Sequence, residues 1–190
     1  MGRRFVQRIA LLTSPQSFWE WSLEFYARPG VEPTLLALQD RHGLSVNMLV
    51  WCLWCGAHFQ TPTDLVVRKA VDISTRWSAA VTMPLREARR ALKAPPIQAP
   101  KEMTASLRAQ IVKDELAAEK IEQAALERLA VENLVAAESP AEAAVRARKA
   151  LAAYIRLTDA AKSHGFSVSL IENLIGLKFP PSESDGDGVE

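Results

Sequence analysis

The apolar residues of the chain include one continuous run, which extends from Met48 to Gly56 within the segment Leu44–Phe59. Ser45 precedes this run and is a typical N-cap residue, so the segment predicts a helix. A helix that is apolar on all of its faces is typical of the buried centre of a soluble protein. The run is shorter than the ~20 residues that a membrane-spanning helix requires. We therefore expect a buried central helix, with the rest of the chain folded around it, and no membrane segment.

Three more amphipathic helices are predicted in the N-terminal half. A capping box, Ser17 followed by Glu20, starts the helix that ends before Gly30. The next helix ends at Gly43, because glycine readily adopts the left-handed conformation of a helix C-cap. Another helix follows the central one, and we expect Pro84 to kink or restart it. These helices predict a compact N-terminal bundle.

A proline-rich segment at residues 95–103 separates this bundle from a part of the chain that is rich in Ala, Glu, Lys and Leu. There the pattern predicts a long helix over residues 104–137, and Ser139 starts a second helix that reaches Ser163. The apolar stripe expected on the long helix consists of Leu107, Ile111, Ala118, Ile121, Ala125 and Leu129. We expect the acidic residues between Glu115 and Glu122 on its opposite, solvated face. The short turn between the two helices predicts an antiparallel hairpin.

The fold class that follows is all-α: a compact N-terminal bundle of about four helices around the buried central helix, and a long C-terminal antiparallel hairpin. The expected divisions are a flexible arm at 1–15, an N-terminal helical domain at 16–94, the linker at 95–103, the hairpin with a short last helix at 104–177, and a disordered acidic tail at 178–190.

The charge distribution and the cysteine content bear on the cellular location of the protein. The net charge is only +1, but basic residues exceed acidic ones before residue 100 and acidic residues exceed basic ones after it. The two cysteines both fall in the central apolar run, as is typical of reduced, buried thiols. The N-terminal residues lack the pattern of a secretory signal. We expect a cytoplasmic protein.

Long motifs within Phe18–Gly56 resemble an uncharacterised family of small proteobacterial proteins, a domain of unknown function. The motifs are FWEWSLEFYARPGV, LALQDRHG and VNMLVWCLWCG. The resemblance supplies no activity and no functional residues. It implies a compact N-terminal part and a C-terminal part of freer sequence.

Two short patterns could carry chemistry. Cys52 and Cys55 have the spacing of a redox or metal motif, with His58 three residues later. Their place in the middle of an apolar helix, and the lack of a fourth ligand, favour a structural role. Asp40 and His42 could form an acid–base pair beside the central helix. The alternative, which we favour, is that Asp40 and Asn47 satisfy turn amides around Gly43.

A basic stripe and the tryptophans are the remaining candidates. The stripe consists of Arg68, Lys69, Arg76, Arg86, Arg89, Arg90 and Lys93. It could contact nucleic-acid phosphates or an acidic protein, but a solvated helix face is the commoner reason for such a pattern. The five tryptophans could line a pocket for a hydrophobic ligand or haem, although tryptophans at helical spacing more often form a core.

These patterns predict a non-enzymatic helical interaction or adaptor protein. Its C-terminal hairpin would bind a protein partner or a second copy, and we expect no nucleic-acid binding. The candidate contact residues are Arg86, Arg89, Arg90, Ile121 and Leu129. Core residues are expected at Phe18, Trp21, Trp51, Cys52 and Trp54. A hydrophobic-ligand-binding module built on the Trp-rich N-terminal domain is the alternative, and an enzyme of unknown type comes third. We assign no catalytic, cofactor-binding or metal-binding residue and no cofactor.

Overall fold

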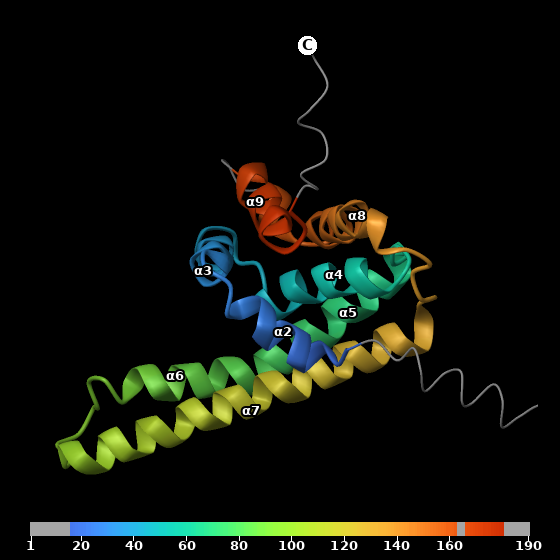
Figure 1. Cartoon of the computed structure of the whole chain (residues 1–190). Helices are drawn as coiled ribbons and strands as arrows, with labels where there is room; N and C mark the ends of the chain where they lie inside the picture. Colours follow the sequence, from blue (N-terminus) through green and yellow to red (C-terminus); the bar gives the residue numbers. More distant parts are fainter. Residues whose placement is uncertain (1–15, 163–165, 181–190) are drawn as a thin grey trace, which may run out of the picture.

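The described part of the chain is helical and confirms the all-α fold class (Figure 1). This computed structural model describes residues 16–162 and 166–180, so the predicted arm at 1–15 and nearly all of the predicted tail at 178–190 lie outside it. The α-helices are α2 (Phe18–Tyr26), α3 (Val31–His42), α4 (Val46–His58), α5 (Asp64–Trp77), α6 (Met83–Ala91), α7 (Lys101–Asn133), α8 (Ala143–Arg156) and α9 (Val168–Lys178).

The central apolar run forms α4, which is covered on all sides. The Ser45 hydroxyl caps it by accepting a hydrogen bond from the backbone N–H of Met48. Every residue from Met48 to Gly56 is buried. Helix α8 lies on one side of α4, and α2 and α5 lie on the other (Figure 1). The five residues predicted for the core, Phe18, Trp21, Trp51, Cys52 and Trp54, all belong to the same buried cluster.

Helices α4 and α8 approach each other closely because both carry small residues where they cross. Gly56 of α4 faces Ala147 of α8, and a Cβ atom on Gly56 would lie 2.5 Å from the backbone nitrogen of Ala147. Ala143, Ala150 and Ala153 are also buried on α8. Alanine and glycine therefore set the distance between these two helices.

Helix α5 continues into α6 through one π-helical turn, Ser78–Thr82. The backbone N–H of Met83 donates to the carbonyl of Ser78, five residues earlier. This wider turn directly precedes Pro84, whose ring would clash with the carbonyl of Ala80 in a regular α-helix. The sequence predicts a kink or restart at Pro84, and a new α-helix, α6, does begin at Met83 after this change of helical pitch.

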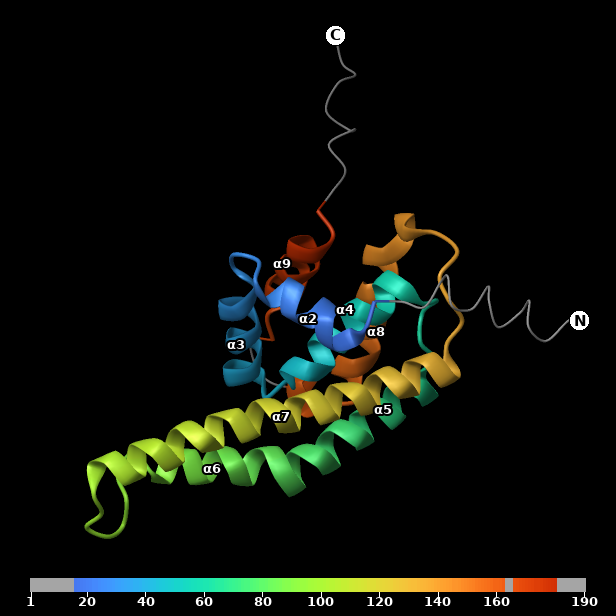
Figure 2. The same ribbon diagram turned by 60° about the horizontal axis from the view of Figure 1, so that its bottom comes forward.

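The two C-terminal helices do not pair with each other as the sequence suggested. Helix α7 packs along α5, the π turn and α6, whereas α8 packs on α4 (Figures 1 and 2). The segment after α7 returns along the end of α4, where Gln60 N–H donates to the carbonyl of Val135 and Ala137 N–H donates to that of His58. The buried alanine face of α8 packs on α4 at Gly56.

Residues 92–100, which include most of the predicted linker, form the loop at the far end of the α6–α7 pair, and this pair projects from the rest of the molecule (Figure 2). One buried cluster contains residues from both sides of this loop. It includes Trp51 of α4, which precedes the loop, and Leu126 of α7 and Leu151 of α8, which follow it. The predicted linker therefore separates two neighbouring helices of one projection, and the cores expected on its two sides are joined.

We predict that Gly56→Ala destabilises the protein by about 1–3 kcal/mol or more, because the new methyl group would overlap the α8 backbone. Urea denaturation followed by circular dichroism measures this change. Gly176→Ala is the matched control, since Gly176 also lies in a helix but has open space around its Cβ position. That control should gain stability of up to about 1 kcal/mol. Equal stability of the two variants would contradict the close α4–α8 contact.

Candidate functional site

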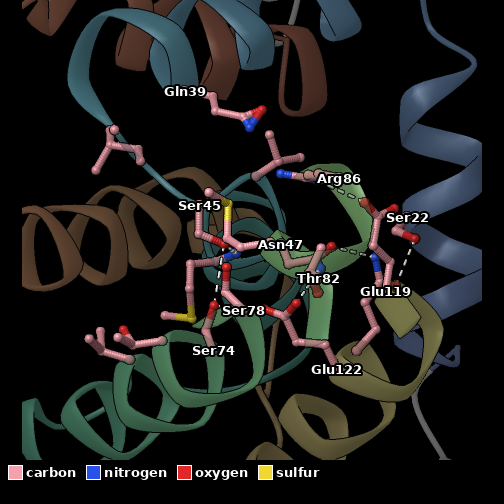
Figure 3. Close-up of a pocket in the computed structure, with 18 of the residues that line it drawn as sticks. Ser22, Gln39, Ser45, Asn47, Ser74, Ser78, Thr82, Arg86, Glu119 and Glu122 are labelled. Carbon is pink, nitrogen blue, oxygen red and sulfur yellow. Dashed lines mark hydrogen bonds and ion pairs between the residues drawn. The ribbon is translucent and has the colours of Figure 1, made fainter. Parts of the chain in front are cut away.

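A cleft of about 900 Å³ opens beside the N-terminal end of α4 (Figure 3). Its walls come from α2, α3, α5, the π turn, α6 and α7, and they are largely apolar. The apolar wall residues include Trp19, Leu23, Leu36, Met48, Val71, Met83 and Leu116. The buried part of the cleft also contains several polar side chains. A concave, mainly apolar site with a few convergent polar groups is typical of ligand pockets.

Five buried or half-buried polar side chains form one hydrogen-bonded network, which we call the polar floor: Ser22, Asn47, Ser74, Glu122 and Gln123. The Gln123 amide accepts from the Ser22 hydroxyl at 3.0 Å and donates to the Asn47 side-chain oxygen at 3.0 Å. Asn47 donates to one carboxylate oxygen of Glu122 at 3.0 Å, and Ser74 donates to the other at 2.6 Å. The polar floor therefore ties α2, α4, α5 and α7 together.

The polar floor continues to α8 through the cap of α4. The hydroxyl oxygens of Ser74 and Ser45 lie 3.3 Å apart, and the backbone N–H of Ser45 donates to the hydroxyl of Tyr154 at 2.8 Å. Burial raises the pKa of Tyr154, so its hydroxyl keeps its proton at neutral pH. Hydrogen bonds thus link the first turn of α4 to three other helices.

Glu122 is a buried carboxyl group that makes none of the ion pairs in the described part of the chain. Burial raises its pKa, and the nearby Glu119 carboxylate acts in the same direction. The hydrogen bonds from Ser74 and Asn47 and the charge of Arg86 oppose this shift. The carboxyl group therefore holds its proton more tightly than a carboxyl group in water does.

The expected orientation of α7 was wrong at its acidic positions. Glu115 and Glu122 were expected on the solvated face, and both are buried. Leu107 and Ile121 were expected to face inward, but 51% and 55% of their surfaces are exposed. The buried face of α7 follows a seven-residue spacing through Glu115, Glu122 and Leu129 that the apolar pattern does not reveal.

Two arginines of the basic stripe contact α7. Arg86 pairs with Glu119 at 2.9 Å, at the side of the cleft, and Arg89 pairs with Glu115 at 2.6 Å. Arg90 is exposed. Of the two apolar residues that the sequence singled out for partner binding, Ile121 is exposed and Leu129 belongs to the buried cluster.

Cys52 and Cys55 are free thiols in the core, and burial raises the pKa of both. A thiol with a raised pKa is a poor nucleophile and a poor metal ligand at neutral pH. His58 lies beside Trp54, with 5.7 Å between ring centres, and burial lowers its pKa. Among the described residues, no three His, Cys, Asp or Glu side chains are grouped so that they could hold a metal ion.

The other polar candidates lie apart from one another. Asp40 is exposed, and the ring of His42 packs on Phe166 with 4.9 Å between ring centres. The hydrogen bonds that the Asn47 side chain makes in the polar floor run to α7, so the expectation that it satisfies turn amides at Gly43 was wrong. Of the five tryptophans, Trp19 lines the cleft. Trp21, Trp51 and Trp54 are core residues.

A family model described as a protein of unknown function (DUF2390) matches residues 17–126. The chain belongs to this family. The DUF2390 region begins at the cap of α2 and ends within α7, so it crosses the loop at 92–100 and contains the whole polar floor. No curated protein and no solved structure gives a significant match to the chain. None of the helices in the described ranges combines the length and the apolar character that crossing a membrane requires.

We predict that the Glu122→Gln variant becomes progressively more stable than the wild type, in free energy of unfolding, as the pH rises from 4 to 7. The folded protein binds the Glu122 proton more tightly than the unfolded chain, so the stability that Glu122 contributes to the wild type is lost as the pH rises from about 4.5 through the raised folded-state pKa. Glutamine keeps the shape of the side chain and does not titrate. It can accept from Asn47 and donate to Ser74, whose hydroxyl can then donate to Ser45.

Urea denaturation at pH 4, 5, 6 and 7 measures this difference. Glu138→Gln is the control, because Glu138 lies exposed in the segment after α7. A stability difference between Glu122→Gln and the wild type that stays constant over this pH range would contradict a buried, titrating Glu122.

Proposed function

We propose that this DUF2390 protein is a non-enzymatic binding protein whose cleft takes a small amphipathic ligand. The observation that supports this proposal is the joining of apolar walls to a hydrogen-bonded polar floor in one cleft of about 900 Å³. Each member of the floor is oriented by at least one other member, so the polar groups are held ready for a ligand. Preorganised polar groups reduce the entropy lost on binding.

The π turn Ser78–Thr82 gives independent support, because it lines the cleft between α5 and α6. Single π turns within α-helices occur frequently at functional sites. Here the turn brings Ser78, Ala79 and Thr82 to the cleft. The local change in helical pitch therefore coincides with the proposed binding site.

The proposed site differs from the Trp-rich pocket considered from the sequence. Most of the tryptophans are used in the core or in hydrogen bonds to the backbone, such as that from Trp77 to the carbonyl of Ala118. The walls are mainly aliphatic instead. We also propose a cytoplasmic location, since free, buried cysteines suit a reducing compartment.

We predict that Ala79→Trp abolishes binding of Nile red, a neutral fluorescent dye, because the indole would fill the mouth of the cleft. Ala79 is exposed and lines the cleft, so the substitution leaves the core unchanged. Ala80→Trp is the matched control, since Ala80 is the next residue along the same turn, is exposed and does not line the cleft. Fluorescence titration should give dye binding to the wild type and to Ala80→Trp. Equal binding by all three proteins would overturn the proposed site.

A second candidate function, a protein-interaction or adaptor role, is supported by the exposed side of α7. Met103, Leu107 and Ile121 are 69%, 51% and 55% exposed and share one face of the helix. Ala117 and Ala124 lie on the same face and are also exposed. Exposed apolar stripes of this kind are typical of helix–helix interfaces. The partner proposed from this pattern is a second copy of the chain.

We predict that the wild type self-associates at micromolar concentration and that Leu107→Asp with Ile121→Asp makes it monomeric. The two charges would be buried in the proposed interface, but they lie on a solvated surface in the monomer. Sedimentation velocity measures the change. Leu65→Asp is the control because Leu65 is 63% exposed on α5. A wild type that is monomeric at this concentration would remove the support for self-association.

A further inference from the structure

The charges that line the cleft are mainly negative. Glu32, Glu119 and Glu122 contribute carboxyl groups, and Arg86 contributes a guanidinium group. Arg86 is already paired with Glu119 at 2.9 Å. Glu32 and Glu122 are in none of the ion pairs of the described residues. An anionic ligand would therefore meet uncompensated carboxyl groups in the cleft, whereas a cation would be attracted.

Glu122 is the deepest of these carboxyl groups, with 4% of its surface exposed. Each of its oxygens accepts one hydrogen bond from the polar floor, and a carboxylate can accept about four in all. A buried carboxylate without a cation is costly, and this cost favours the neutral form. A cation at this place would complete an ion pair around a carboxylate whose geometry is already fixed.

Thr82 provides a second observation that points to a ligand. It is 3% exposed, lines the cleft from the π turn, and has a hydroxyl oxygen without a hydrogen-bond partner among the described residues. Figure 3 places it among the polar side chains that gather near Glu119 and Glu122. Buried hydroxyl groups usually have a partner, so an unpaired one at the wall of a cleft suggests a polar atom of a ligand.

We propose that the cleft is selective for primary amines that carry an apolar chain or ring. The ammonium group would donate hydrogen bonds to Glu122 and Thr82, since an ammonium group has three donors and no acceptor. The apolar part would pack against Leu23, Leu36 and Met83 on the walls. This inference rests on the proposed ligand-binding function and adds the chemical class of the ligand.

Tyr26 fits the same ligand chemistry. It lines the cleft, and burial together with the charges of Glu119 and Glu32 raises its pKa, so the phenol is neutral at physiological pH. A neutral phenol on the wall of the cleft adds apolar surface and the face of a π system. Cations bind favourably to aromatic faces.

Isothermal titration calorimetry with three probes of equal length tests the proposal on the full chain at pH 7: octylamine, octan-1-ol and octanoate, each below its aggregation concentration. The amine should bind about tenfold or more tightly than the alcohol, as expected for one charge-assisted hydrogen bond, and octanoate should bind most weakly. Glu122→Gln should abolish the preference for the amine, so that the amine and the alcohol bind with about equal affinity. Glu138→Gln should behave as the wild type.

Thr82→Val gives a separate measurement that does not alter Glu122. It should weaken binding of the amine more than binding of the alcohol, because it removes a hydroxyl that accepts from the ammonium group but keeps the shape of the side chain. Equal affinity of the wild type for amine and alcohol, or an amine preference that survives in Glu122→Gln, would overturn the amine assignment. Nile red binding that depends on Ala79 would then still support a ligand site, so the two proposals can fail separately.

Discussion

A helix that is apolar on every face must be covered on every side, and this requirement of α4 organises the whole chain. The helices before residue 94 cover part of its surface, and α8 covers the side at Gly56. Without α8, the N-terminal helices would leave that side of α4 exposed to water. The C-terminal helices are therefore part of the same core, although a proline-rich segment precedes them. That segment became a loop at the end of a helical projection because α7 runs back along α5 and α6.

The sequence predicted the helices far better than it predicted how they pack. Ser17 and Ser45 cap helices in the structure as the sequence predicts, because capping depends on residues three positions apart. The packing of one helix on another depends on residues that are far apart in the sequence. In α7, moreover, apolar residues occur on several faces, so the pattern did not show which face is buried. Alanines occur all around that helix, while its exposed faces carry Leu107, Val112 and Ile121. Nothing local distinguishes Glu122, which is buried, from a glutamate on a solvated face.

The cleft was still harder to predict, because its polar floor is assembled from four helices. Asn47 and Ser74 are ordinary polar residues in their own segments, and they explain the burial of Glu122 only when both donate to it. One signal was present in the sequence. Glutamates at positions 115 and 122 share a seven-residue spacing with Leu129, and a charged residue in an apolar register can indicate a buried polar site.

The polar floor also relates the cleft to the projection of α6 and α7. Helix α7 contributes Glu122 and Gln123 to the floor, and one turn earlier Glu119 pairs with Arg86 of α6. A cation bound at Glu122 would reduce the repulsion between this carboxylate and Glu119, which now contributes to the raised pKa of Glu122. Because α7 carries both Glu122 of the floor and Glu119 of the pair with Arg86, a ligand that binds only the folded arrangement would stabilise the cleft and the α6–α7 projection together.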